Sequence, residues 1–255
     1  MLLSGSRRLS DLAFLVVAGL ERHVGRQHLE RPAADVQMLV DGDLSLLARL
    51  MGTGQPGLRW RCWQNRHCLV VPRNWSRLPG FRDAVLDCPL PVALRASGGS
   101  AVTHGPHILN ISLCWLAMAA DGVGIQQGYA RLTGPILATL ADMGVAADLS
   151  RVAGAHCDGH CNLVHDGRKL AGTAGLIRPA GGMRGLLLHA SLTLASLDGD
   201  LDIIMGFERR MGRVADYRPD AHVSLSAALR GDTLSALPAP AERRDRADRG
   251  TARHG

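Results

Sequence analysis

Aromatic residues are scarce in this sequence, which holds four Trp, two Tyr and three Phe among 255 residues. Proteins that bind single-stranded nucleic acid stack bases on aromatic side chains beside a basic groove. These nine aromatic residues are too few to interleave with basic residues along the chain, although the net charge is +6. The positive charge therefore favours encounters with acidic proteins, and no nucleic-acid partner is expected.

Long apolar runs are also missing. A membrane-spanning helix needs about 20 apolar residues, whereas the run at 12–20 is shorter and continues into the charged Glu21 and Arg22. Arg7 and Arg8 precede this run, but no small-residue cleavage site follows it. The pattern predicts an amphipathic helix rather than an export signal, so we expect a soluble cytoplasmic protein without a membrane partner.

The cysteine pattern of a small disulfide scaffold is absent too. The chain has six cysteines and 46% hydrophobic residues, enough to bury a core without cross-links, which favours a reducing compartment. We expect a helical N-terminal extension at 1–31 and one main domain at 32–237. A disordered Arg-rich tail is expected at 238–255, because this segment lacks a run of apolar residues.

Hydrophobic periodicity predicts an α/β (α+β) fold, with a mixed, largely antiparallel sheet flanked by helices. The strand at 107–115 alternates apolar and polar residues and is expected to be buried on one face. Asp166-Gly167 is a strong signal for a two-residue hairpin turn. Strands are also expected at 58–63 and 68–72, joined by a polar turn at 64–66. Further strands are expected at 162–165, 168–178 and 186–197, and helices at 32–51, 125–143, 201–211 and 224–229.

A glycine-containing segment, Arg95-Ala-Ser-Gly-Gly-Ser-Ala-Val-Thr-His104, is the first candidate for chemistry. Adjacent glycines let a backbone approach a ligand, and successive amides can face an oxyanion. The glycine spacing matches neither a P-loop nor a dinucleotide fingerprint. A bare turn is the alternative interpretation of Gly98-Gly99.

A second segment, His156-Cys157-Asp158-Gly159-His160-Cys161, gathers two cysteines and two histidines. Zinc prefers these ligands, but structural zinc sites usually draw them from two separated segments, and no second pair stands out in this chain. A metal site and a loop with buried thiols both stay open as alternatives. A third candidate is Lys169, which follows the hairpin turn; an exposed, solvated lysine is its ordinary role, but the neighbouring Ala171 and Gly172 leave room for a ligand.

Taken in order, four blocks resemble the family of lipoate-protein ligases, octanoyltransferases and biotin ligases. The family pattern runs roughly Arg-Arg-x-Ser/Thr-Gly-Gly-Gly-Ala-Val-x-His, then Leu-Asn-x-Ser, then Gly-x-Lys-x-x-Gly, then His-Gly-Ser/Thr-Leu. The corresponding segments are Leu94-Arg-Ala-Ser-Gly-Gly-Ser-Ala-Val-Thr-His104, Leu109-Asn-Ile-Ser112, Gly167-Arg-Lys-Leu-Ala-Gly172 and His189-Ala-Ser-Leu192.

The cysteine-type octanoyl and lipoyl amidotransferases resemble this chain most, because they carry Cys-Pro-Gly-x-x-Asp-Leu where this sequence has Cys157-Asp-Gly-His-Cys-Asn-Leu163. The resemblance implies that Cys157 accepts the acyl group as a thioester and that Lys169 contacts the acyl carbonyl. His104, His156 and His160 are candidates for the proton transfers. The implied substrate-binding residues are Arg95, Ser97, Gly98, Gly99, Ser100, Ala101, Val102, His104, Asn110, Gly172 and His189.

The implied activity is transfer of an octanoyl or lipoyl group from a carrier protein to a lysine of a lipoyl domain. The donor would be acyl carrier protein or a glycine cleavage H-type protein, and the acceptor a lipoyl domain of a 2-oxoacid dehydrogenase-type complex. A monomer with no metal and no tightly bound cofactor is expected. Leu94 and Ser100 replace an arginine and a glycine of the pattern, which weakens the case for an acyl-adenylate and for the ATP-dependent ligase alternative. A metal-binding or carrier-binding protein without catalysis is the alternative of another class.

Overall fold

The computed structural model describes residues 9–157, 159–196, 199–213 and 216–231. The tail predicted at 238–255 lies outside these residues. No helix within the described ranges combines the length and the apolar character needed to cross a membrane.

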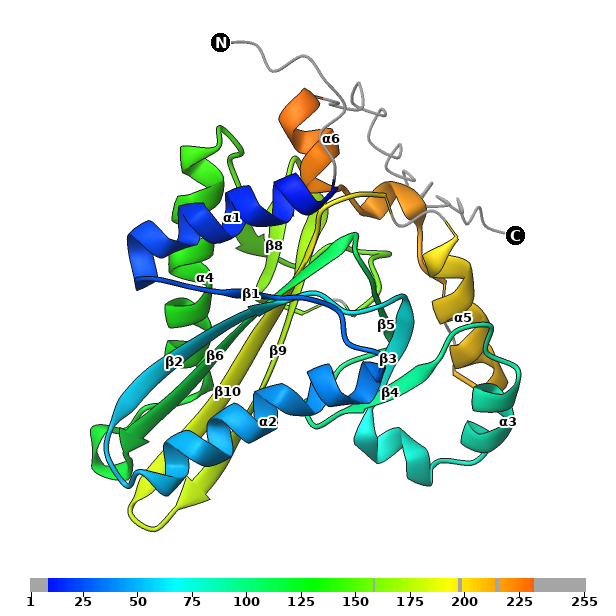
Figure 1. Ribbon diagram of the computed structural model, residues 1–255. Helices are drawn as coiled ribbons and strands as arrows, with labels where there is room; N and C mark the ends of the chain where they lie inside the picture. Colours follow the sequence, from blue (N-terminus) through cyan, green and yellow to red (C-terminus); the bar gives the residue numbers. More distant parts are fainter. Residues whose placement is uncertain (1–8, 158, 197–198, 214–215, 232–255) are drawn as a thin grey trace, which may run out of the picture.

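A seven-stranded sheet forms the centre of the molecule (Figure 1). Within the described residues β1 pairs with β2 in parallel, and the other neighbouring strands pair antiparallel. The expected mixed, largely antiparallel sheet is therefore confirmed. Its spatial order is β1 (Leu29–Glu30), β2 (Gly57–Trp63), β6 (Ile108–Met118), β10 (Met183–Thr193), β9 (Arg168–Ala180), β8 (Asn162–His165) and β7 (Asp148–Ser150).

A second, three-stranded sheet lies beside the first and has the order β4 (Val92–Arg95), β3 (Cys68–Pro72), β5 (Val102–His104). The strands predicted at 58–63 and 68–72 are present, but the segment 64–66 between them leads from the large sheet to the small one. Side chains hold this connection in place, because Gln64 Nε2 donates to the carbonyl of Pro106 and Asn65 Nδ2 to that of Val36.

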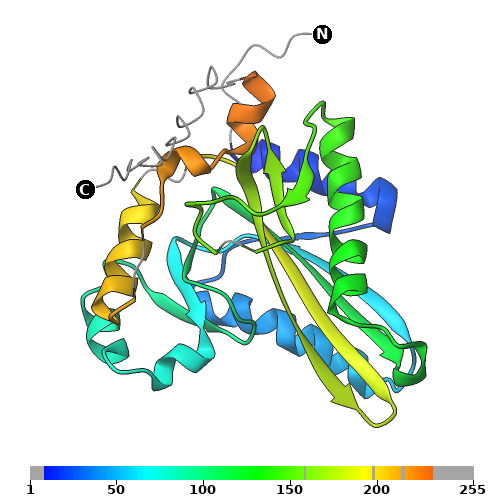
Figure 2. The same ribbon diagram turned by 180° about the vertical axis from the view of Figure 1, so that it is seen from behind.

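Helices cover both faces of the large sheet. The helix α2 (Val36–Gly52) begins at Asp35, whose carboxylate accepts from the amide of Gln37, and it lies across the front face in Figure 1. The helix α4 (Ile125–Asp142) covers the opposite face, which Figure 2 shows in front, and α1 (Leu9–Val24) packs against it. The helices α3 (Phe81–Leu86) and α5 (Asp200–Arg210) pack with the small sheet, and α6 (Leu225–Arg230) ends the described chain; 3-10 turns occur at Arg73–Arg77, Ala119–Asp121 and Pro219–Ala221.

The central strand β6 is buried on both faces rather than on one, so this detail of the sequence prediction was wrong. Its apolar face, with Leu109, Ile111 and Leu113, packs into the core formed with α1 and α4. Its polar face, with Asn110 and Ser112, turns toward α2 instead of solvent. The alternation of polar residues on β6 therefore indicates a buried polar pocket rather than a surface that faces water.

The predicted hairpin turn at Asp166-Gly167 is confirmed. Both residues have positive φ, 47° and 70°, as a two-residue type I′ turn requires. The turn joins β8 to β9 and fixes the register that pairs Lys169 with Val164. It therefore brings Lys169 back beside the segment that carries Cys157.

Candidate active site

A single pocket collects most of the residues singled out from the sequence. It lies where α2 and the glycine segment approach the α2-side face of β6, β9 and β10. Of the predicted residues, those lining it are Arg95, Ser97, Ser100, Val102, His104, Asn110, His156, Cys157, Lys169, Gly172 and His189.

The glycine segment, residues 96–101, is shaped by Arg95 from within. Arg95 is buried, and its guanidinium donates to the carbonyls of Val70, Gly98 and Ser100 at 2.6–3.3 Å. Burial lowers the pKa of Arg95 to about 10, and the neighbouring Cys157 opposes this shift. The guanidinium is thus engaged by the backbone, so its role is to hold the loop.

Gly99 brings the loop against the cysteine sulfur. Its φ is +107°, and a Cβ at this position would lie 2.8 Å from Sγ of Cys157 and 3.0 Å from a guanidinium nitrogen of Arg95. A side chain there would therefore displace the sulfur. Gly98, in contrast, has open space where a Cβ would stand.

Cys157 has a backbone and an environment that are unusual for a structural thiol. Its φ of +52° is rare for a residue other than glycine, and such strain is concentrated at functional sites. Burial raises the pKa of the thiol, but the charge of Lys169, hydrogen bonds from Ser100 and the charge of Arg95 outweigh it, so the pKa lies below its ordinary value of 9.0. The thiolate, which is the nucleophilic form, is favoured.

Lys169 is buried and tied to the cysteine segment. Its Nζ donates to the carbonyl of His156 and, at 3.2 Å, to that of Cys157. A Cβ on Gly172 would lie 3.1 Å from both Cε and Nζ of this lysine. The sequence predicts that Gly172 leaves room for a ligand. In the structure it leaves room first for the side chain of Lys169.

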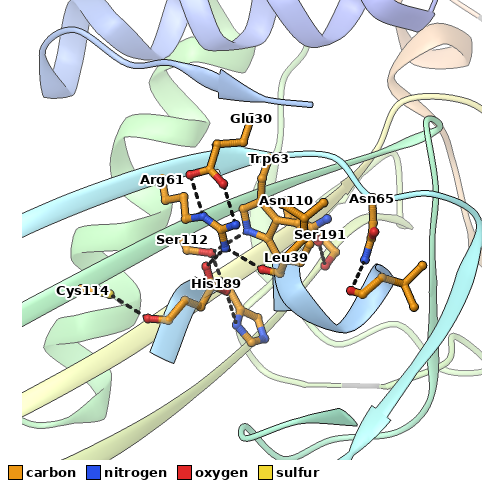
Figure 3. Close-up of polar contacts among 12 residues, drawn as sticks. Glu30, Leu39, Arg61, Trp63, Asn65, Asn110, Ser112, Cys114, His189 and Ser191 are labelled. Atoms are coloured by element: carbon orange, nitrogen blue, oxygen red, sulfur yellow. Dashed lines mark hydrogen bonds and ion pairs between the residues drawn. The ribbon is translucent and has the colours of Figure 1, made fainter. Parts of the chain in front are cut away.

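A chain of polar contacts leads from Glu30 at the sheet edge through Arg61 to His189 (Figure 3). Arg61 donates to Glu30 and to Asp43 of α2, and Asp43 also accepts from Ser112 at 2.8 Å. His189 Nδ1 lies 3.8 Å from Asp43, and its Nε2 lies 3.1 Å from the hydroxyl of Ser97. Asp43 thereby connects the charged network to the ring that holds the glycine segment.

Four histidines line the pocket, and burial makes each of them a weak base. Burial followed by the charge of Arg95 lowers the pKa of His189 to about 3, and burial followed by Lys169 lowers that of His222 to about 4. Burial also lowers the pKa of His104 and His156 well below the ordinary value. His156 stacks on His222, with ring centroids 4.9 Å apart. The imidazoles are therefore neutral near pH 7 and able to accept a proton.

Two buried polar atoms in this pocket lack a partner within the described residues. They are Nδ2 of Asn110, whose Oδ1 accepts from Ser191, and Nδ1 of His104. An unsatisfied buried donor is costly, by about 1–3 kcal/mol. Their presence on the pocket wall indicates that a polar group of a ligand or a water completes them.

Some predicted residues lie away from the pocket wall. Ala101 packs into the core beside α5, where its amide donates to Glu208, and Gly98 and Gly99 act through backbone shape. His160 is exposed and contacts Arg151, so it does not join the other histidines. Asp158 lies outside the described residues.

Sequence reasoning missed several residues of the pocket. Asp43 sits in an apolar helix and His222 in an unremarkable loop, and nothing in their neighbourhood marks them. A signal did exist for Ser191 and Thr193, because they continue the alternation that begins at His189, with Leu on the opposite face.

The metal alternative required Cys157 and Cys161 to converge with His156 or His160. Among the residues that the structure describes, three such ligand atoms lie within 4.8 Å of one another in one group, and that group is His67, His107 and Asp200. The described residues of segment 156–161 are not part of such a group.

One protein family and several known proteins are similar to this chain in sequence. The family described as lipoyl protein ligase A/B catalytic domain matches residues 37–226. An octanoyl-[GcvH]:protein N-octanoyltransferase from Kyrpidia tusciae is 38% identical over 175 residues, which cover 64% of this chain and 59% of that protein. An enzyme of the same name from Geobacillus kaustophilus is 30% identical over 129 residues, covering 49% and 45%. The chain spans about half the length of these curated relatives.

Solved structures share the fold. Lipoate-protein ligase A bound with ATP superposes with a TM-score of 0.54 at 18% identity, over 80% of this chain and 82% of that one. A T. acidophilum protein solved with bound lipoic acid gives a TM-score of 0.55 at 18% identity, over 80% and 81%. At such identities the likeness concerns the fold alone.

Proposed function

This chain belongs to the lipoyl protein ligase A/B catalytic domain family, and from that premise we propose that it transfers an octanoyl or lipoyl group through a thioester on Cys157. The observation that carries the proposal is the environment of this thiol. Cys157 has a lowered pKa, contacts the glycine segment and shares a pocket with Lys169. Cys62, Cys68 and Cys114 are buried, and burial raises the pKa of each to about 12.

The acyl chain would occupy the apolar end of the pocket. The apolar side chains that line the pocket include Val40 and Leu44 of α2, Leu187 of β10, Trp63 and Ile108. An eight-carbon chain gains about 0.8 kcal/mol for each CH₂ that it buries, so such a wall favours it over short acyl groups. Val102 and Gly172 also line the pocket, whereas their neighbours Ala101, Leu170 and Ala171 belong to the core.

The reaction would proceed in two steps. In the first, the Cys157 thiolate attacks the acyl carbonyl of the donor, and the donor's sulfur or nitrogen leaves and takes up a proton. In the second, the acceptor lysine amine attacks the thioester, loses a proton, and the thiolate leaves. The amide of Ser100 and the ammonium of Lys169 flank the sulfur and would stabilise negative charge on the carbonyl oxygen. A neutral histidine of the pocket would take up the proton of the amine only in passing and release it to water, because burial makes it a weak base.

We propose that this transfer does not use ATP. Binding the phosphate of an acyl-adenylate calls for a free positive group beside the glycine segment. Arg95 instead donates to three backbone carbonyls, and Leu94 stands where the family pattern has a further arginine. No tightly bound cofactor is required by this scheme.

The names of the relatives suggest the partners. We propose a glycine cleavage H-type protein as donor, with acyl carrier protein as the second candidate, and a lipoyl domain as acceptor. We further propose that the chain acts as a monomer in the cytoplasm, where its six free cysteines would stay reduced.

Mass spectrometry of the intact protein tests this proposal. After incubation with an octanoyl-loaded H-type protein, the chain should gain the mass of one octanoyl group, and a lipoyl domain added next should remove it. A parallel sample receives free octanoate and ATP with the lipoyl domain. Octanoylation of the lipoyl domain in that sample, with no adduct on the chain in the first, would establish the ligase alternative instead.

A further inference from the structure

Two histidines and an aspartate converge outside the acyl pocket. His67 Nε2 lies 2.9 Å from one carboxylate oxygen of Asp200, and His107 Nε2 lies 2.7 Å from the other. The two rings meet edge to face, with centroids 5.6 Å apart. We propose that His67, His107 and Asp200 form a binding site for a divalent transition-metal ion of the zinc type.

The spacing of these atoms suits such an ion. Tetrahedral zinc with bonds of about 2.0–2.1 Å separates its ligands from one another by about 3.3 Å. The contacts from both histidines to the carboxylate are roughly half an ångström shorter, so a small outward movement would admit the ion. Each imidazole can carry its proton on Nδ1, which frees Nε2 as the ligand atom.

The surroundings hold the group together. His67 comes from the connection between β2 and β3, His107 from that between β5 and β6, and Asp200 from the first turn of α5. A Cβ on Gly105 would lie 2.6 Å from the ring of His107, so the missing side chain lets this ring fold against the backbone. The three segments come from both sheets and a helix, and an ion would therefore fasten parts of the fold that are distant in sequence.

The group is closed on one side and open on the other. The side chain of Asp200 is 7% exposed and that of His107 16%, whereas that of His67 is 45% exposed. Three protein ligands with an exposed face leave a coordination position for water, as in exchangeable sites rather than fully closed structural ones. His107 also accepts from the amide of Leu194 and precedes the pocket residue Ile108. The ion would thus stabilise the end of the acyl pocket without touching Cys157.

The competing interpretation is that Asp200 is simply satisfied by two histidine hydrogen bonds. Glutamine separates the two interpretations, because its amide can still donate to the carboxylate but is a poor zinc ligand.

His67→Gln and His107→Gln are therefore the test variants. His23→Gln is the matched control, since His23 is not in this group and pairs with a single carboxylate, Asp142, at 3.5 Å.

The experiment uses the untagged full chain, stripped with a chelator and dialysed against ZnCl₂. The expected results are one Zn²⁺ per wild-type and His23→Gln chain, a melting temperature that rises with Zn²⁺, and an affinity at least about tenfold lower in both test variants. With Co²⁺ in place of Zn²⁺, visible bands should appear without a near-ultraviolet thiolate band, which excludes the cysteines as ligands. The proposal is overturned if the wild type retains no Zn²⁺, if the glutamine variants bind it as tightly, or if the Co²⁺ spectrum shows thiolate ligation.

Discussion

The two faces of β10 differ sharply in chemistry. Toward α4 the strand presents Leu186, Leu188, Ala190 and Leu192, all buried in one apolar core. Toward α2 the same strand presents Leu187, then His189, Ser191 and Thr193, which line the acyl pocket. One face stabilises the fold, whereas the other buries polar groups that need partners.

The difference shows where the protein accepts a cost in stability. Each buried Leu contributes about 1.5–3 kcal/mol on the α4 side. On the α2 side, Arg61 and Asp43 form a buried ion pair, which contributes little or nothing relative to apolar residues of similar volume. Burial lowers the pKa of Arg61, but Glu30 and Asp43 together raise it by more, so the guanidinium stays charged. The pair instead shapes the pocket, because Asp43 also accepts from Ser112 and lies beside His189.

The largest expected effect concerns the nucleophile on the α2 side. Cys157→Ala should reduce octanoyl transfer to the uncatalysed background, because no thioester can form, while the melting temperature changes little. Cys161→Ala is the matched control and should keep most of the activity, since burial raises the pKa of this thiol. Transfer rates and thermal melts of both variants check this; equal loss in the two would remove Cys157 from its special role.

Gly99→Ala is expected to follow, with a loss of roughly a hundredfold. The added Cβ would stand 2.8 Å from Sγ of Cys157 at a φ of +107°, so the sulfur must shift, and small misplacements of a reacting group cost about that much. Gly98→Ala is the neighbouring control, because open space surrounds its position. Similar transfer rates for the two variants would contradict the close contact between the loop and the thiol.

Adjacent residues on β10 allow a direct test of the two faces. Leu188→Ala should lower the free energy of unfolding by about 2–5 kcal/mol, because this side chain is fully buried between Gly128 and Gly175. The folded fraction should still transfer octanoyl groups at nearly the normal rate.

His189→Gln should show the reverse, with a reduced turnover number and a smaller loss of stability, since it frees the hydroxyl of Ser97. Urea unfolding and steady-state kinetics on both variants measure the contrast. If Leu188→Ala and His189→Gln both lower stability and neither lowers the turnover number, the α2-side face of β10 has no special role in transfer.

The sequence predicts the apolar side of this comparison well and the polar side only in part. Periodicity locates β6 and β10 within a few residues, because one face of each strand is largely apolar, and the Asp166-Gly167 turn locates β8 and β9 on either side of it. Motif order finds the glycine segment, Cys157 and Lys169. Partners that meet across the fold are not visible this way: Asp43 and His189 are 146 residues apart in the chain, and no local pattern joins them.

The same limit explains the errors of detail. The polar face of β6 follows the pattern of a water-facing strand, and only the packing of α2 with its buried Asp43 turns that face into an interior. The segment 64–66 is short and polar like a hairpin turn, yet its side chains bind backbone of other segments and lead the chain into another sheet. Both outcomes depend on contacts distant in sequence.

The smallest expected effect is on the ionisation of the thiol. Lys169→Met keeps the length of the side chain but removes the charge, which is the largest influence that lowers the pKa of Cys157. The pKa should therefore rise toward or above 9.0, and each unit of increase leaves tenfold less thiolate at neutral pH.

The rate of alkylation by iodoacetamide, measured from pH 6 to pH 10, reports the fraction of Cys157 that is thiolate. In the wild type the midpoint of this curve should lie below pH 9. In Lys169→Met it should lie at higher pH, and the more basic thiolate should reach a plateau at least as high. Arg168→Met, a change in the adjacent residue, should leave the curve in place. Coincident curves for the wild type and Lys169→Met would mean that hydrogen bonds from Ser100, rather than the lysine, hold the thiol ready to react.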